Sequence, residues 1–309
     1  MRISTPWSYQ LSVNSMLDQQ AKLSHLQMQL STQKKILTPS DNPAGAALII
    51  DLNQGIKETE QYQSNINSVR QRLTLSESLL QSSVDILDRI KELGLQALNA
   101  TYSAVDRATI AIEMQELKEQ LLGLANTRNA NNEYLFSGFK SNTQPFTKNV
   151  AGGYDYGGDA NQRNLQIGTN RQITDGDPGI NVFGTPSGLA PTDPLQIPGS
   201  ITNVLEAIDK FATDLSVNTL NSNSLDDIDA ALNRISTIQS SIGVRLNALD
   251  RLDNLHGDGA LSMKAQLSEV EDLDIADAIS KFTLQRNSLE AAQQAFNTVK
   301  NLSLFNFIR

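Results

Sequence analysis

The sequence predicts a mainly helical protein with a small β-rich segment inserted between its helices. Apolar residues recur at helical spacing in the first 130 residues and again after residue 224. Glycine and proline gather between these regions, because residues 137–200 hold eleven of the 18 glycines and six of the nine prolines. The first and last segments each carry a narrow apolar stripe with the spacing of a coiled coil. These observations indicate helices at both ends of the chain and turns in the middle.

The N-terminal segment predicts a helix with one strict apolar column. A second column begins at Val13, but its next members are Gln20, Gln27 and Lys34. One apolar and one polar column suit a coiled coil with polar neighbours better than a helix buried on a wide face. The strict column repeats every seventh residue, at Tyr9, Met16, Leu23, Leu30 and Leu37.

The C-terminal segment predicts a matching helix. Its apolar residues are spaced alternately by three and four, and only Gln285 interrupts them. We expect the two terminal helices to pair as a coiled coil, and we name their apolar residues the assembly seam. Because each stripe is thin, both ends are expected to order only in an assembly. On this side the seam comprises Ile275, Ala278, Phe282, Leu289, Ala292, Phe296, Val299, Leu302, Phe305 and Phe307.

The helices between the two ends predict an antiparallel bundle. A break at residues 38–43 precedes a long helix that runs to about residue 98, with Asp41 or Asn42 as its cap and Pro43 in its first turn. A second helix is expected over about 105–128, and a third from Ser224.

The glycine-rich middle of the chain predicts a small β-rich domain. Short runs such as residues 165–167 and 180–183 lie between turn signals and are expected to be strands. The predicted domains are a terminal coiled coil of residues 1–40 plus 275–309, a helical bundle of 41–140 plus 200–274, and an inserted β-rich domain of 141–199. We expect the β-rich domain to lie outermost.

Composition excludes several function classes. The chain has no cysteine and two histidines, which removes thiolate chemistry and a three-histidine metal site. Its net charge of −9 argues against general nucleic-acid binding, although residues 1–37 and 281–309 each carry four basic side chains and one acidic one. No catalytic, cofactor-binding or metal-binding residues are predicted. His256 is expected in a loop, the Gly152–Asp159 run in a turn, and the acidic run 269–274 at a solvated helix start.

Three stretches resemble the flagellin family of bacterial axial proteins. The first runs from Met1-Arg2-Ile3-Ser4-Thr5 to Thr38-Pro39-Ser40-Asp41-Asn42-Pro43. The second is Asn132-Glu133-Tyr134-Leu135-Phe136-Ser137-Gly138 followed by Gln144-Pro145-Phe146, and the third runs from Asp274-Ile275-Ala276 to Phe305-Asn306-Phe307-Ile308. The resemblance covers about residues 1–146 and 200–309.

This resemblance implies a secreted, non-enzymatic structural subunit of the extracellular flagellum. The tail and the length of 309 residues resemble the ring-forming junction subunits between hook and filament, and a small filament flagellin is the alternative. The implied partners are other copies of the chain, the other and larger hook–filament junction protein, flagellin and a cytoplasmic export chaperone. The family also implies export of the unfolded chain through the flagellar type III channel, with no cofactor and no membrane insertion.

Overall fold

The computed structural model describes residues 5–150, 152–187 and 203–305. Internal contacts divide the chain into two compact units. The terminal unit is formed by the two ends of the chain, up to Thr59 and from Gly257 onward, and the central unit is Glu60–His256. The expected mainly helical fold with a small β region is confirmed, whereas the division into three domains stays a prediction.

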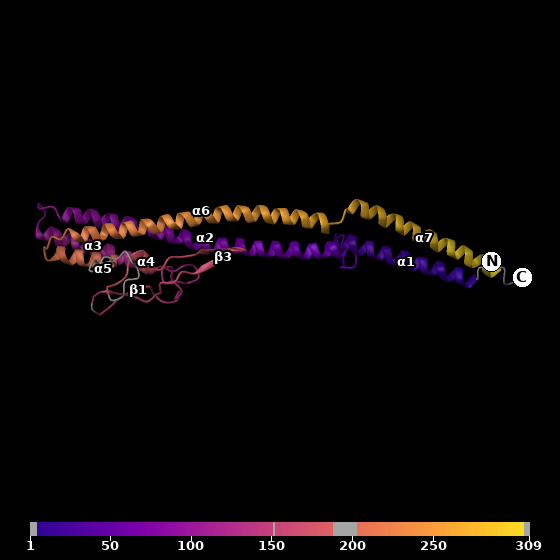
Figure 1. The fold of residues 1–309 in the computed structure, drawn as a ribbon, viewed down its shortest axis with the longest axis horizontal. Coiled ribbons are helices and arrows are strands. Elements are labelled where there is room, and N and C mark those ends of the chain that lie inside the picture. Colours follow the sequence, from indigo (N-terminus) through magenta and orange to yellow (C-terminus); the bar gives the residue numbers. More distant parts are fainter. Residues whose placement is uncertain (1–4, 151, 188–202, 306–309) are drawn as a thin grey trace. The chain divides into compact units, whose positions relative to one another are not determined.

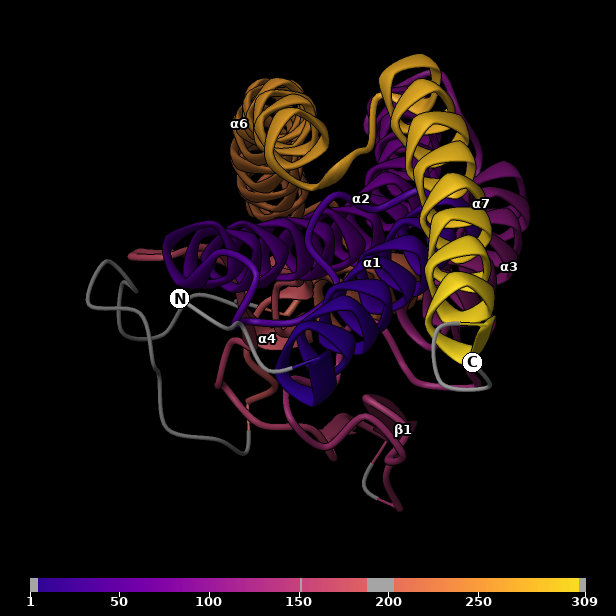
Figure 2. The same cartoon turned by 90° about the vertical axis from the view of Figure 1, so that its right-hand side faces the viewer.

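In the terminal unit, helices α1 (Thr5–Thr32) and α7 (Ile275–Phe305) lie side by side (Figures 1 and 2). Directly after α1, residues 33–35 hydrogen-bond with residues 271–273, which precede α7. The Lys35 amide donates to the Glu271 carbonyl at 2.7 Å, and the Leu273 amide donates to the Gln33 carbonyl at 3.0 Å. These bonds run antiparallel, like the bridge that joins Lys34 and Asp272. They fix the register in which the two terminal helices meet.

Helix α2 (Pro43–Ala97) begins where the proline at residue 43 predicts. The Asn42 side chain accepts from the Gly45 amide at 3.0 Å and is therefore the cap. Asp41 instead accepts from the amides of Leu37 and Thr38, at 3.0 and 2.9 Å, and closes the preceding turn. The two candidate caps thus have different roles.

The central unit is built from the remainder of α2, α3 (Ala104–Ala125), α5 (Val204–Ser216) and the first part of α6 (Asn223–Glu271). These helices run alongside one another, with the β region against them (Figure 1). One continuous apolar core joins them, with Ile66, Leu73 and Phe211 fully buried. Sequence reasoning missed α5, although its apolar residues recur at helical spacing after the Asn203 cap.

The β region consists of two antiparallel hairpins. Strands β1 (Phe146–Lys148) and β2 (Tyr154–Tyr156) form one, and β3 (Asn164–Gly168) and β4 (Arg171–Thr174) form the other. The expected strand at residues 165–167 is confirmed within β3.

Residues 180–183 were expected to be a strand, and that prediction is wrong. They form the short helix α4 (Gly179–Phe183). Phe183 packs edge-on against Phe136 and Phe146, with ring centroids 5.3 and 5.8 Å apart. The apolar run therefore packs into a compact aromatic cluster instead of pairing as a strand. Periodicity over only four residues cannot distinguish a short helix from a strand.

Buried ion pairs attach the β region to the helices of the central unit. The Arg72 guanidinium donates to the Leu135 carbonyl at 3.1 Å and contacts Glu133 at 3.3 Å. Arg245 of α6 contacts Asp177 at 2.5 Å, and Asp177 is buried. The Arg72 Nε atom also lies 3.9 Å from Asp175, directly after β4. Because both arginines come from long helices, they hold the loop after β4 in place.

Two further expectations about α6 and its end are wrong. His256 lies inside α6 and not in a loop, and its Nε2 is 2.8 Å from the Ile167 carbonyl of β3. Most of the acidic run 269–274 is the end of α6 and the link to α7, and only Asp274 lies at a helix start, where its side chain accepts from the Ala276 and Asp277 amides at 3.0 and 3.1 Å. Among the described residues, no helix combines the length and the apolar character needed to cross a membrane.

Candidate functional site: the terminal helix pair

The antiparallel pair of α1 and α7 places the two halves of the assembly seam opposite each other. The rings of Tyr9 and Phe296 lie 4.7 Å apart between centroids. Further along, Met16 and Leu289 line the same hollow between the helices. The register that begins at residues 33–35 and 271–273 therefore continues along the described length of both helices.

Most of the predicted seam is only partly covered. Ala278 and Leu289 are buried, whereas Tyr9 and Ile275 are each 45 % exposed. The side chains of Val299, Leu302 and Phe305 lie outside the described residues, although their backbone belongs to α7, and Phe307 lies outside the described chain. The half-buried members are Val13, Met16, Leu23, Leu30, Leu37, Phe282, Ala292 and Phe296.

Residues of two neighbouring columns flank the central column of α1. Gln20 and Gln27 are exposed, whereas Val13, Gln19 and Leu26 are half-buried. Positions three and four residues after a member of the central column both lie beside it on the helix surface, so either can face a partner. Val13 and Gln20 of the expected column line the hollow between α1 and α7.

An amide therefore lies between the helices at the predicted Gln20, and a second one lies beside it at Gln19. The Gln19 Oε1 atom is buried and has no hydrogen-bond partner in the part of the chain that the structure describes. Gln285 of α7 is half-buried, as its position in the seam predicts. A buried amide oxygen without a hydrogen-bond donor destabilises the helix pair. The pair is therefore poorly suited to be stable in an isolated monomer.

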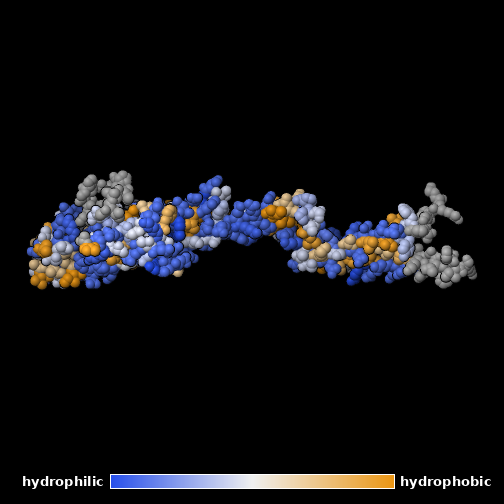
Figure 3. All heavy atoms as spheres, turned by 90° about the horizontal axis from the view of Figure 1, so that it is seen from below, coloured by the Kyte–Doolittle hydropathy of each residue, from blue (hydrophilic) through white to orange (hydrophobic). Residues whose placement is uncertain are grey.

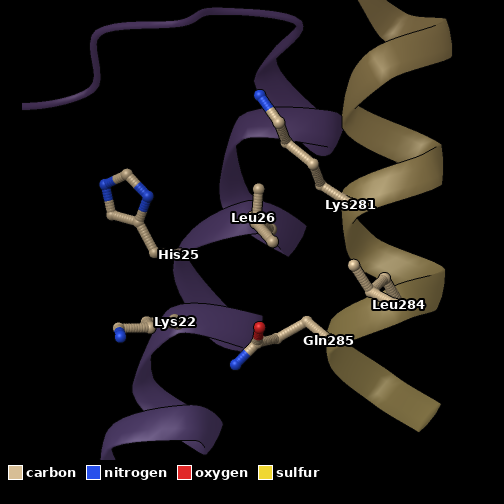
Figure 4. A pocket seen from close by; sticks show the side chains of 6 residues that line it. All are labelled: Lys22, His25, Leu26, Lys281, Leu284 and Gln285. Atoms are coloured by element: carbon tan, nitrogen blue, oxygen red, sulfur yellow. The ribbon is translucent and has the colours of Figure 1, made fainter. Parts of the chain in front are cut away.

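Two hollows open between the helices. One, of about 340 Å³, is lined by Lys22, His25, Leu26, Lys281, Leu284 and Gln285 (Figure 4). The second has a similar volume and lies between Met16, Leu17 and Gln20 of α1 and Leu289 and Phe296 of α7. Two side-by-side helices thus leave space that their own side chains do not fill.

Exposed apolar side chains also lie on the pair where sequence reasoning placed no functional residue, two of them (Leu17 and Leu284) in the hollows. Trp7, Leu17 and Met28 of α1 are 63 %, 58 % and 50 % exposed, and Ile279 and Leu284 of α7 are 52 % and 69 % exposed. Apolar patches are visible over the terminal helices in Figure 3. Such surface on a thin pair is typical of an interaction site.

His25 closes a local turn near the end of α1. Its Nε2 is 3.2 Å from an oxygen of Asp41. The backbone amide of Thr38 is the main cause that lowers the pKa of Asp41, and His25 adds to it. Within the described residues, no three histidine, aspartate or glutamate side chains cluster in a way that would hold a metal ion.

Known proteins match the chain over its whole length. Residues 3–141 match the bacterial flagellin N-terminal helical region. The flagellar hook-associated protein 3 of Escherichia coli K12 is 31 % identical over 99 % of both chains. The chain belongs to the family of flagellar hook-associated protein 3. Like the other members of that family, it is a structural subunit of the bacterial flagellum.

A solved structure agrees with this assignment. The flagellar junction protein of Legionella pneumophila superposes with a TM-score of 0.59 at 25 % identity, covering 72 % of this chain and 99 % of that one. The flagellin FlaB1 of Treponema pallidum is 28 % identical but covers 82 % of this chain. The whole-length match therefore favours the hook-associated protein over the alternative of a small filament flagellin.

Proposed function

We propose that the protein forms the junction ring between the flagellar hook and filament, and that it assembles through its terminal helices. Its partners in this role are further copies of itself, the larger junction protein on the hook side and flagellin on the filament side. The assembly seam defined above supplies the contact residues. The role is mechanical and involves no catalysis.

The observation that carries this proposal is the incomplete burial of the α1–α7 pair. Leu284 is 69 % exposed and Tyr9 is 45 % exposed, although both are large apolar side chains. Burying such a side chain gains roughly 1.5–3 kcal/mol, so the pair gains stability when further helices cover it. A chain with these ends favours a ring of neighbours over an isolated monomer.

The same property supports export of the chain in an unfolded state. Terminal helices that gain most of their stability in the assembly are loosely held in the monomer, and a cytoplasmic chaperone can bind them before export. The chain also contains no cysteine, so no disulfide can lock a fold inside a narrow channel. We therefore propose secretion through the flagellar type III channel to the cell exterior.

The test is electron microscopy of a strain that lacks this protein. We expect hooks without filaments, together with flagellin of a different chain shed into the medium, and recovery of filaments when the gene is restored. Attached filaments of normal length in the deletion strain would contradict the proposal. A loss of filaments without shed flagellin would favour the flagellin alternative.

A further inference from the structure

We propose that the hollow lined by Lys22, His25, Leu26, Lys281, Leu284 and Gln285 binds one turn of α6, Asp258–Leu261, from a second copy of this chain. This inference rests on the proposed function, because it names the contact between neighbouring copies in the ring. We name the hollow the cationic hollow and the α6 turn the acidic ridge.

The cationic hollow combines basic side chains with an apolar floor, and of its basic groups His25 lies 3.2 Å from Asp41. Its lining contains two lysines, a histidine and no carboxylate. Lys22 forms no ion pair within the described residues, and Lys281 contacts Asp277 at 2.6 Å in an exposed pair. Exposed pairs of this kind contribute about 0–1 kcal/mol, so Lys281 can change partner at little cost.

The floor of the hollow is apolar and is complementary to an apolar side chain. Leu26 is half-buried and Leu284 is 69 % exposed, and both border the opening between α1 and α7 (Figure 4). Gln285 reaches across from α7 toward α1 in the same view. The complementary surface is therefore an apolar side chain with a carboxylate close beside it.

The acidic ridge has this composition. Leu261 is 70 % exposed, and Asp258 is exposed and forms no ion pair among the described residues. The two residues are three positions apart in α6, so their side chains lie on neighbouring parts of one helix face. When α6 of one copy docks in the hollow of another, Leu261 contacts Leu284 of the hollow. Asp258 then lies beside Lys22 and Lys281.

Gly259 makes the ridge easy to approach. A Cβ atom at this position would meet nothing within 4 Å, so packing inside the chain does not require a glycine there. A glycine within a helix costs about 1 kcal/mol relative to alanine. Its presence next to the exposed Leu261 is accounted for by close approach of a second chain.

Several other carboxylates of α6 are already paired. Asp229 contacts Lys91 at 2.6 Å, Asp250 and Asp253 contact Arg70 at 3.1 and 3.0 Å, and Glu271 contacts Lys34. The hollow and the ridge are different surfaces of one chain, so their contact is head-to-tail. Repetition of such a contact closes a ring or continues as a helix, as a junction requires.

The test uses the absence of cysteine from the chain. Leu284→Cys and Leu261→Cys are placed on two differently tagged chains, which are co-expressed in a strain lacking the natural protein. Intact flagella are then oxidised and their chains separated by size. We expect a disulfide-linked dimer carrying both tags, which can only join two copies.

A matched control replaces Leu261→Cys by Ile112→Cys, at a residue of α3 that is 67 % exposed. This pair should give no mixed dimer. Equal yields from the two pairs, or links from Leu284→Cys only to other flagellar proteins, would overturn the inference.

Charge reversal provides a second measurement. Asp258→Lys on the Leu261→Cys chain should lower the mixed-dimer yield about tenfold, since like charges across an interface cost more than 1.4 kcal/mol. Lys22→Asp on the Leu284→Cys chain should restore much of the yield. An unchanged yield after Asp258→Lys would contradict the predicted pairing.

Filament formation separates this inference from the proposed function. Attached filaments without the mixed dimer would overturn the hollow-to-ridge contact and leave the junction role intact. Cells that carry the unaltered chain but attach no filaments would overturn both.

Discussion

A buried lysine joins two helices of the central unit. The Lys118 side chain of α3 is 1 % exposed, and its Nζ atom lies 2.7 Å from Asp209 of α5 and 2.6 Å from Gln115. Burial by itself lowers the pKa of Lys118, but the Asp209 carboxylate outweighs it and the net pKa is raised. For Asp209, burial opposes ionisation, and its bonds to Lys118 and Gln115 still lower the pKa below 3.8.

Removing the carboxylate should therefore destabilise the central unit. We expect Asp209→Ala to lower the free energy of unfolding by about 3 kcal/mol, because it leaves Lys118 charged and buried without its counter-charge. The double variant Lys118→Met with Asp209→Leu should recover most of this loss, because it replaces the pair by apolar groups. Urea denaturation followed by circular dichroism measures both; equal stability of Asp209→Ala and the natural chain would refute this role.

The Lys118–Asp209 pair makes the free energy of unfolding depend on pH. Because the folded-state pKa of Asp209 is lowered, its contribution is fully present above about pH 4, near the ordinary carboxyl value, and is lost as pH falls through the lowered value. The difference in unfolding free energy between the natural chain and Asp209→Asn should therefore shrink below pH 4. A difference that stays constant from pH 7 to pH 2 would contradict this assignment.

Two glycines within helices have opposite surroundings. A Cβ at Gly94 of α2 would lie 2.5 Å from the Phe211 ring of α5, whereas one at Gly123 of α3 would meet nothing within 4 Å. We expect Gly94→Ala to destabilise the protein by about 1–3 kcal/mol through overpacking. The matched control Gly123→Ala should stabilise it by up to about 1 kcal/mol. Thermal unfolding of the two variants checks the sign of each change.

At the scale of the element, amide side chains of α1 affect the stability of the terminal pair. Gln20 lines the hollow between α1 and α7, whereas the Gln19 Oε1 atom is buried without a donor among the described residues. Gln19→Leu should stabilise the pair by about 1–3 kcal/mol, because it removes this unsatisfied oxygen. Gln27→Leu, at an exposed amide of the same helix, is the control and should have little effect on pairing.

Hydrogen exchange of the α1 and α7 amides in assembled flagella measures this difference. Greater protection in Gln19→Leu, combined with reduced motility, would indicate that the natural amide keeps the pair adaptable. Equal protection in Gln19→Leu and Gln27→Leu would show that the unsatisfied oxygen of Gln19 does not weaken the pair.

At the scale of the whole molecule, we expect the central unit to be stable by itself and the terminal unit to depend on assembly. The continuous apolar core lies between Ile66 and Leu252, inside the central unit. Deleting residues 290–309 removes Phe296 and the tail but none of this core. We expect the central unit to retain its cooperative unfolding while the truncated chain fails to attach filaments.

Circular dichroism and electron microscopy test these two statements separately. Attached filaments in cells carrying only the truncated chain would disprove the role of the tail. Loss of cooperative unfolding would show instead that the central unit needs the terminal helices. Brief proteolysis of the unassembled full chain should cut the terminal helices before the central unit.

Local signals in the sequence determined the long helices and the family. Pro43 and its preceding asparagine determined where α2 begins, and the heptad spacing of Tyr9, Met16 and Leu23 determined the first helix. These signals are local because capping and periodicity involve neighbouring residues. The terminal motifs carried the resemblance to the flagellin family, which the whole-length match bears out.

Only the tertiary structure decided which face of each element meets another. The run Ile180–Phe183 became a helix because Phe183 completes an aromatic cluster with Phe136 and Phe146. Gln19 and Gln20 lie beside the same seam of α1, where the Gln19 Oε1 atom is buried and Gln20 lines the hollow toward α7. A heptad position has two equivalent flanks, and four apolar residues fit a strand or a helix, so neither choice is fixed until the partner surface is in place.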